Sequence, residues 1–142
     1  MCSNTACSKE EAAKSYYAQG CNCAQAVFLA FAEELGLSAD VAGKIALPYG
    51  GGMGRGETCG ALTGALMALG LAQNASVPPA PEEKNAACAK AKTLANDFQE
   101  TFGTTLCREI LALPEGKGKK LCPALVGFMA ARLESMLKED NQ

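Results

Sequence analysis

Apolar residues recur along this chain at intervals of three and four, and no stretch shows the strict apolar–polar alternation of a half-buried strand. Capping residues such as Ser8 and Ser38 begin the periodic segments, and Gly20, Gly36 and Gly103 end them. We therefore predict an all-α, single-domain helical bundle of about five to seven helices. The predicted helices cover residues 8–19, 23–35, 39–46, 59–72, 82–102, a short segment around 107–111, and the chain from 122 onward.

One predicted helix differs from the others in its pattern. Residues 59–72 are apolar nearly all round, and a helix without a polar face is buried on all sides. We predict that this helix is the centre of the bundle. Its successor, residues 74–81, is too rich in proline for regular structure, and we interpret it as a linker or lid. Residues 1–7 are predicted to be a flexible N-terminus.

The composition sets limits on the function. The 142 residues are 49% hydrophobic and 20% charged, as expected for one globular domain with a real core. A net charge of −2 argues against nucleic acid as a partner, and the longest apolar runs are too short to span a membrane. The N-terminus has no basic segment followed by an apolar one, so we expect no secretory signal and a cytoplasmic location.

The histidine and cysteine counts narrow the chemistry further. The chain has no histidine, which excludes Cys–His and Ser–His catalysis and histidine-bound metals. It has eight cysteines, at positions 2, 7, 21, 23, 59, 88, 107 and 122. In a cytoplasmic chain with a good core, such cysteines point to metal or redox chemistry more than to a disulfide scaffold.

A glycine-rich loop precedes the apolar helix. Between residues 49 and 64, seven of sixteen residues are glycine, and Cys59 stands where the loop becomes a helix. Such a loop can aim several backbone N–H groups at one point, as a cradle for a thiolate or a bound cofactor. The alternative is a tight connection between buried helices, with Cys59 as a small core residue. The candidate cofactor-binding residues are Gly51, Gly52, Gly54, Cys59 and Gly60.

The order of the helices predicts where four cysteines meet. In an up-and-down bundle with short connections, the helices that begin near Cys23, Cys59, Cys107 and Cys122 all begin at one pole. Helix N-termini are electropositive, so we expect lowered thiol pKa values at this pole. These four cysteines are our candidate catalytic residues and our candidate metal ligands, with Cys21 as an additional ligand or a resolving thiol.

The remaining cysteines are predicted to lie elsewhere. Cys88 precedes the end of its helix by about fourteen residues, or about 20 Å, and we interpret it as a core residue. Cys2 and Cys7 belong near the opposite pole. A basic loop at residues 113–120 joins Cys107 to Cys122; we interpret it as a solvated turn, with contact to a partner as the alternative.

Several segments together carry a resemblance to a known family: Cys21–Val27, Gly50–Gly54, Thr58–Gly64, Phe102–Leu111 and Cys122–Val126. With these segments in this order, the chain resembles the redox-active family named for its cysteine signature, C_GCAxxG_C_C, over nearly its whole length. The resemblance implies that Cys23, Cys59, Cys107 and Cys122 are the functional set. The chain departs from the label in two places: residues 59–61 read Cys-Gly-Ala in place of Gly-Cys-Ala, and the segment between Cys107 and Cys122 is short.

Three functions are open from the sequence. The first and leading hypothesis is a redox protein, an oxidoreductase or electron carrier, that uses the four thiols with a redox partner protein or a small redox-active molecule. Against this hypothesis, the chain lacks a Cys-x-x-Cys motif. The second is an iron–sulfur cluster or Zn²⁺ held by four thiolates, although no ferredoxin or zinc-ribbon spacing is present. The third is a helical interaction protein whose cysteines merely pack.

Overall fold

The chain folds into seven α-helices with no strand among the residues that the structure, a computed structural model, describes, which are 8–140. The predicted all-α, single-domain bundle is confirmed. Short helical turns lie between some of the helices, at Leu47–Tyr49, Gly52–Gly56 and Pro114–Lys119. The helices are α1 (Lys9–Ala18), α2 (Cys23–Ala32), α3 (Ala39–Ala46), α4 (Gly60–Gln73), α5 (Pro81–Phe102), α6 (Cys107–Ala112) and α7 (Cys122–Asp140).

Capping side chains determine where the first three helices begin. The backbone N–H of Glu11 donates to Ser8 Oγ at the start of α1, and that of Val41 donates to Ser38 Oγ at the start of α3. At α2, Asn22 Oδ1 accepts from the Gln25 backbone N–H at 2.9 Å, and the Gln25 side chain accepts from the Asn22 backbone N–H at 3.0 Å. Each of these bonds satisfies an N–H that the first turn leaves without a helical partner.

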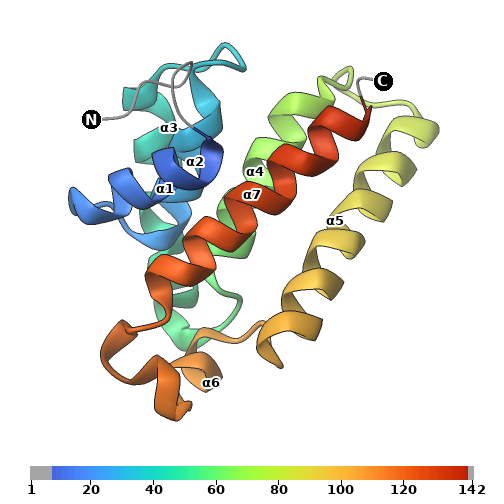
Figure 1. Ribbon diagram of the computed structural model, residues 1–142. Coiled ribbons are helices and arrows are strands. Elements are labelled where there is room, and N and C mark those ends of the chain that lie inside the picture. Colours follow the sequence, from blue (N-terminus) through green and yellow to red (C-terminus); the bar gives the residue numbers. More distant parts are fainter. Residues whose placement is uncertain (1–7, 141–142) are drawn as a thin grey trace.

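Helices α2 and α4 form the centre of the core. Eight of the ten residues of α2 are buried, and α4 contributes seven buried residues of its fourteen. The two helices approach closely because α4 presents Gly60 and Gly64 to α2. A Cβ added at Gly64 would lie 2.4 Å from the Ala24 carbonyl oxygen, and one at Gly60 would lie 2.9 Å from the Ala24 nitrogen. Helices α1 and α7 cover this pair (Figure 1).

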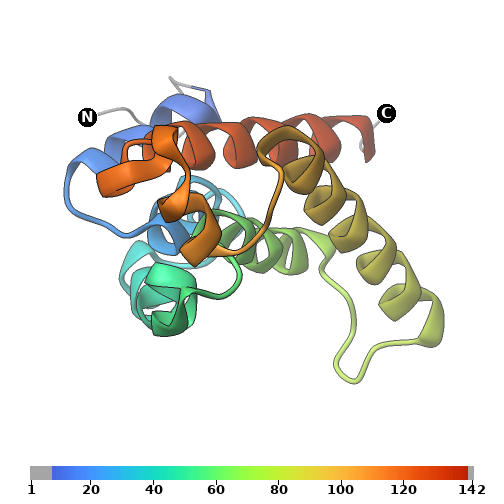
Figure 2. The same ribbon diagram turned by 90° about the horizontal axis from the view of Figure 1, so that it is seen from below.

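Helix α5 diverges from the bundle, with its N-terminal half pointing away from α4 and α7 (Figure 2). Leu94 and Phe98, in its C-terminal half, are its fully buried side chains. Cys88 lies in the diverging half and is exposed. The prediction that Cys88 is a core residue is therefore wrong, because Lys90 and Ala91 lie on the half-buried side of this part of α5 and Cys88 lies on the exposed side.

The connection between α4 and α5 has no helical structure at residues 74–80. It is tied to the start of α5 by Glu83, whose carboxylate accepts from the backbone N–H groups of Ser76 at 3.2 Å and Ala80 at 2.9 Å. The predictions for the N-terminus, for Cys2 and for Cys7 lie outside the described residues. Within residues 8–140, no helix is long and apolar enough to cross a membrane.

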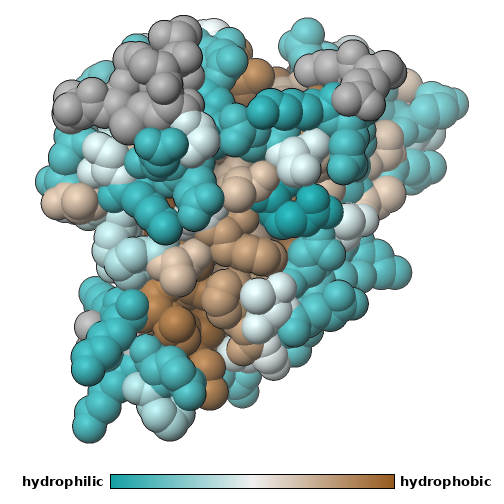
Figure 3. Space-filling model, in the orientation of Figure 1, coloured by the Kyte–Doolittle hydropathy of each residue, from teal (hydrophilic) through white to brown (hydrophobic). Residues whose placement is uncertain are grey.

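Apolar side chains reach the surface near the start of α7 and α6, in the lower half of the view in Figure 3. Phe128 of α7 packs edge to face against Phe102 at the end of α5, with ring centroids 5.2 Å apart. Phe102 in turn packs against Phe98, at 5.1 Å. This aromatic contact holds the C-terminal end of α5 to the bundle and so positions the chain that continues into α6.

Candidate functional site

The four predicted cysteines all stand at helix starts. Cys23, Cys107 and Cys122 are the first residues of α2, α6 and α7, and Cys59 immediately precedes α4. The start of α7, α6 and the segment that leads into α4 lie together at the lower end of Figure 1. Sites far apart in the sequence are thus gathered at one pole of the bundle.

A cavity of about 380 Å³ opens at this pole, and Cys21, Cys23, Cys107 and Cys122 line it. Cys59 is not among its lining residues: it is only 3% exposed and lies in the core. The remaining lining residues are Tyr17, Gly20, Asn22, Gly51, Leu111 and Lys119. The structure therefore brings together three of the four predicted cysteines, together with Cys21, at one cavity, and places the fourth in the core.

A short backbone pairing places Cys59 beside Cys107. The Cys59 N–H donates to the Thr105 carbonyl oxygen at 2.8 Å, and the Cys107 N–H donates to the Glu57 carbonyl oxygen at 2.6 Å. Between them, Thr58 faces Leu106 in an isolated antiparallel bridge. Because these bonds join backbone atoms, the two cysteine positions are held whatever the state of their thiols.

The glycine-rich loop makes a left-handed turn. Gly51, Gly52, Met53 and Gly54 all have φ between 62° and 71°, a conformation that glycine adopts without strain. Gly51 lines the cavity, and a Cβ at Gly52 would lie 2.9 Å from the Cys107 Cβ. At Gly54 an added Cβ would meet nothing within 4 Å. The loop therefore lets the chain approach Cys107 closely; a cofactor role for its glycines stays a prediction.

Among these thiols, Cys122 has a lowered pKa, of about 6. The largest cause is a hydrogen bond from the Cys23 thiol; a hydrogen bond from the Tyr17 hydroxyl and the positive charge of Lys119 act in the same direction. Burial raises the pKa of Cys122, but these three effects together outweigh it. Donors and positive charge favour the thiolate, so Cys122 is the most readily ionised cysteine of the cavity.

The other thiols have raised pKa values, and the prediction of lowered values across the pole is wrong for them. Burial raises the pKa of Cys59 to about 11, although the backbone N–H groups of Ala61 and Leu62 act in the opposite direction. Burial also raises the pKa values of Cys21 and Cys107. The pKa of Cys23 is raised mainly because its thiol donates a hydrogen bond to Cys122. At Cys59 and Cys107, desolvation outweighs the effect of the helix N-terminus.

The described cysteines show neither a disulfide nor a metal site. Cys21, Cys23, Cys59, Cys88, Cys107 and Cys122 are all free. Within residues 8–140, no three cysteine or carboxylate side chains are grouped so that they could hold a metal ion. In this arrangement the four predicted ligands do not form the tetrahedral thiolate set that Zn²⁺ or an iron–sulfur cluster requires, and their role as metal ligands stays a prediction.

A known family model matches the part of the chain that carries these cysteines. The model of the family described as "Putative redox-active protein (C_GCAxxG_C_C)" matches residues 21–136, which include Cys23, Cys59, Cys107 and Cys122. The chain belongs to this family. Comparisons with curated proteins and with solved structures give no match. Membership supports a redox role for the cysteines and leaves the mechanism to be argued from the residues themselves.

Two side chains at the cavity were missed from the sequence. Tyr17, in the last turn of α1, precedes the segment that matches the C_GCAxxG_C_C family, and Lys119 comes from the basic loop that we interpreted as a solvated turn. A signal for Tyr17 was available: α1 ends four residues before Asn22, which caps α2, so its last turn must lie at the cysteine pole. Nothing in the sequence pattern separates Lys119 from its lysine neighbours.

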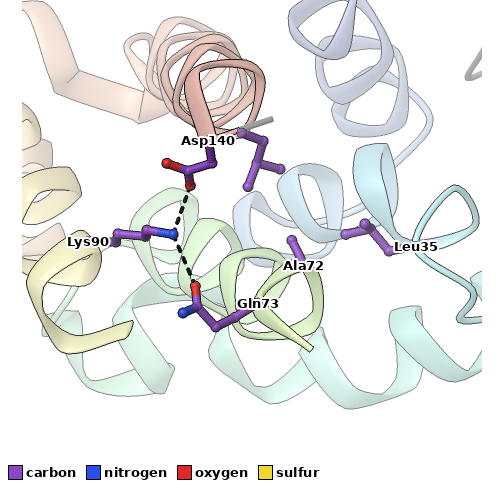
Figure 4. A pocket seen from close by; sticks show the side chains of 6 residues that line it. Leu35, Ala72, Gln73, Lys90 and Asp140 are labelled. Atoms are coloured by element: carbon purple, nitrogen blue, oxygen red, sulfur yellow. Dashed lines mark hydrogen bonds and ion pairs between the residues drawn. The ribbon is translucent and has the colours of Figure 1, made fainter. Parts of the chain in front are cut away.

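A second cavity, of about 260 Å³, lies near the C-terminal ends of α4 and α7 (Figure 4). It is lined by no cysteine, and its charged groups bind one another. Lys90 Nζ lies 2.8 Å from the Asp140 carboxylate and donates to Gln73 Oε1 at 3.3 Å. These bonds join α5 to α7 and α4.

Proposed function

We propose that this protein carries out thiol–disulfide exchange, with Cys122 as the nucleophile and Cys23 as its disulfide partner. The observation that carries the proposal is that both cysteines line one open cavity, where the Cys23 thiol helps to lower the pKa of Cys122 to about 6. The thiolate is the reactive form of cysteine, and a thiol with a pKa near the ambient pH attacks disulfides efficiently. The redox character of the family supports the same reading.

The first step joins Cys122 to the substrate. The Cys122 thiolate attacks one sulfur of a substrate disulfide, the substrate S–S bond breaks, and one substrate thiolate leaves. A mixed disulfide between Cys122 and the other half of the substrate remains. The Tyr17 hydroxyl, which donates a hydrogen bond to Cys122, acts as a positioning group that stabilises the thiolate before the attack. Burial raises the pKa of Tyr17, so it keeps its proton and stays a donor.

The second step uses Cys23, and the first step prepares it. The pKa of Cys23 is raised first by its hydrogen bond to Cys122, then by burial and by the negative charge of Cys122. In the mixed disulfide Cys122 has no charge, so two of these three causes disappear. Cys23 then loses its proton to the first substrate thiolate and attacks the Cys122 sulfur. The bond between Cys122 and the substrate breaks, and the second half of the substrate leaves as a thiolate that takes a proton from water. The products are a Cys23–Cys122 disulfide and two substrate thiols, a two-electron oxidation of the protein.

Access favours a small substrate. Cys122 is only 7% exposed and is reached through a cavity whose volume lies in the range of small-molecule sites, about 300–1,000 Å³. A folded protein that carries a disulfide on its surface could not bring both sulfurs to this depth. We therefore favour low-molecular-weight disulfides, with a thiol reductant returning the protein to its starting state by the reverse steps.

The test is disulfide mapping after reaction with a small neutral disulfide. The reduced full-length protein is incubated without oxygen with bis(2-hydroxyethyl) disulfide at pH 7 and analysed by peptide mass spectrometry. We expect a Cys23–Cys122 disulfide in the unmodified protein. In Cys23→Ser the reaction should stop at a mixed disulfide on Cys122, and in Cys122→Ser the disulfide should be lost. Cys88→Ser, which removes an exposed thiol far from the cavity, is the matched control.

Two outcomes would contradict the proposal. One is a disulfide that joins a different pair while Cys23 and Cys122 stay reduced. The other is iron with sulfide, or zinc, in the protein purified without oxygen, at one site per chain and lost in Cys122→Ser. That second result would favour the metal alternative and would require the cysteine pole to rearrange from the geometry described above.

A further inference from the structure

We infer that the cysteine cavity selects disulfides that carry an anionic group, and that Lys119 binds this group. The inference rests on the proposed thiol–disulfide exchange and names the class of substrate that the same cavity takes. The first observation is the charge of the residues that line the cavity. Of the ten residues around the cavity, Lys119 is the one basic side chain, and no carboxylate lines it.

Comparison with the two other cavities shows how the surroundings of Lys119 differ from those of their lysines. Lys90 at the second cavity is paired with Asp140 at 2.8 Å. Lys9, at a third cavity of about 340 Å³ between α2 and α7, is paired with Glu34. Lys119 has no ion pair with any acidic side chain in residues 8–140. Its ammonium group is exposed and free to meet an anion that enters the cavity.

The position of Lys119 places that anion next to the reacting sulfurs. The charge of Lys119 lowers the pKa of both Cys107 and Cys122, so its ammonium group is within electrostatic reach of both. Among the residues that line the cavity, the Cys122 thiolate is the one anion before reaction. This charge disappears when the mixed disulfide forms, and a carboxylate or phosphate on the bound half of the substrate then replaces it as the partner of Lys119.

The positive charge is local. The whole chain carries a net charge of −2, so the protein as a whole does not attract anions. A selective effect on anionic substrates therefore depends on Lys119 itself and falls as salt screens it. Because Lys119 is exposed, we expect a modest effect, comparable with that of an exposed ion pair, of roughly two- to fivefold in rate.

The experiment compares three disulfides of similar size: 3,3′-dithiodipropionate, which is anionic, bis(2-hydroxyethyl) disulfide, which is neutral, and cystamine, which is cationic. The rate of Cys23–Cys122 disulfide formation is measured for each at low ionic strength. We expect the order anionic, neutral, cationic in the unmodified protein. In Lys119→Gln the anionic-to-neutral rate ratio should fall roughly two- to fivefold. Using a ratio cancels any change in the ionisation of Cys122, which affects all three probes alike.

The controls separate charge from structure. Lys119→Arg keeps the charge and should keep the ratio, and Lys84→Gln, at the far end of α5, should leave it unchanged. Equal rates for the three probes, a preference for cystamine, or an unchanged ratio in Lys119→Gln would overturn the inference. Failure of all three probes to form the Cys23–Cys122 disulfide would instead overturn the proposed function, so the two failures are distinguishable.

Discussion

The starts of α4 and α7 present the same local feature with opposite results. Each has a cysteine at a helix N-terminus, Cys59 at α4 and Cys122 at α7. The pKa of Cys59 is raised to about 11, and that of Cys122 is lowered to about 6. Cys59 is in the core and has two backbone N–H groups as partners, whereas Cys122 borders a cavity and accepts from Cys23 and Tyr17. A helix N-terminus alone does not make a thiolate; side-chain donors and the extent of desolvation decide.

The largest expected effect is on thiol reactivity. At pH 7 a thiol with a pKa of about 6 is about nine-tenths ionised, while one with a pKa of about 11 is ionised in about one molecule in 10⁴. We expect iodoacetamide to modify Cys122 with a midpoint near pH 6 and to leave Cys59 unmodified up to about pH 9. Peptide mass spectrometry over pH 5–10 measures both sites. A shared midpoint near the ordinary thiol value would remove the contrast between the two helix starts.

The same contrast predicts how stability depends on pH. Between about pH 6 and 9, the folded protein has lost the Cys122 proton and the unfolded chain still holds it, so the free energy of unfolding should rise with pH, by at most about 4 kcal/mol. Above about pH 9, the unfolded chain loses the Cys59 proton that the folded state retains, and stability should fall. Urea unfolding in a reducing buffer measures this profile.

A matched variant tests that prediction. In Cys122→Ser the rise between pH 6 and 9 should disappear while the decline above pH 9 persists. If the variant rises over the same pH range as the parent, another group is responsible for the linkage, and the assignment of the low pKa to Cys122 fails.

The glycine-rich loop approaches Cys107, whose backbone is paired with the segment that carries Cys59. This close approach can be tested by substitution in the loop. Gly52 and Gly54 both have positive φ, but only at Gly52 would a Cβ collide, at 2.4 Å from the Glu57 nitrogen. We expect Gly52→Ala to lower the free energy of unfolding by about 1–3 kcal/mol more than Gly54→Ala does, because both share the left-handed strain and only the first adds overpacking. Equal losses, measured by urea unfolding, would contradict the close approach of this loop to Cys107.

The smallest effect concerns Tyr17. Tyr17→Phe removes one of the donors to Cys122 and leaves the Cys23 thiol in place, so the midpoint of Cys122 alkylation should rise by about one pH unit. Tyr16→Phe is the matched control on the same helix, because Tyr16 interacts with Glu33 and Cys21 and makes no bond to Cys122. A midpoint that moves equally in both variants would show that Tyr17 acts through packing and not as a donor.

Much of the fold follows from local signals. Ser8, Asn22 and Ser38 cap helices as their short polar side chains predict, and Gly103 ends α5 with φ of 84°, which glycine tolerates. These interactions join residues that are near in sequence, so the pattern reveals them. The position of Cys88 was not predictable in this way, because its burial depended on which side of α5 faces the bundle, and those contacts join residues far apart in the sequence.

The amino-acid sequence by itself determined the all-α class, the helix starts and the placement of a cysteine at each of four of them. Only the tertiary structure decided which of those cysteines ionises. Cys122 owes its low pKa to Cys23 and Tyr17, which lie about 100 residues away in the sequence, and Cys59 owes its high pKa to the surrounding core. Ionisation depends on solvent access and on donors in three dimensions, and neither is encoded in the spacing of residues along the chain.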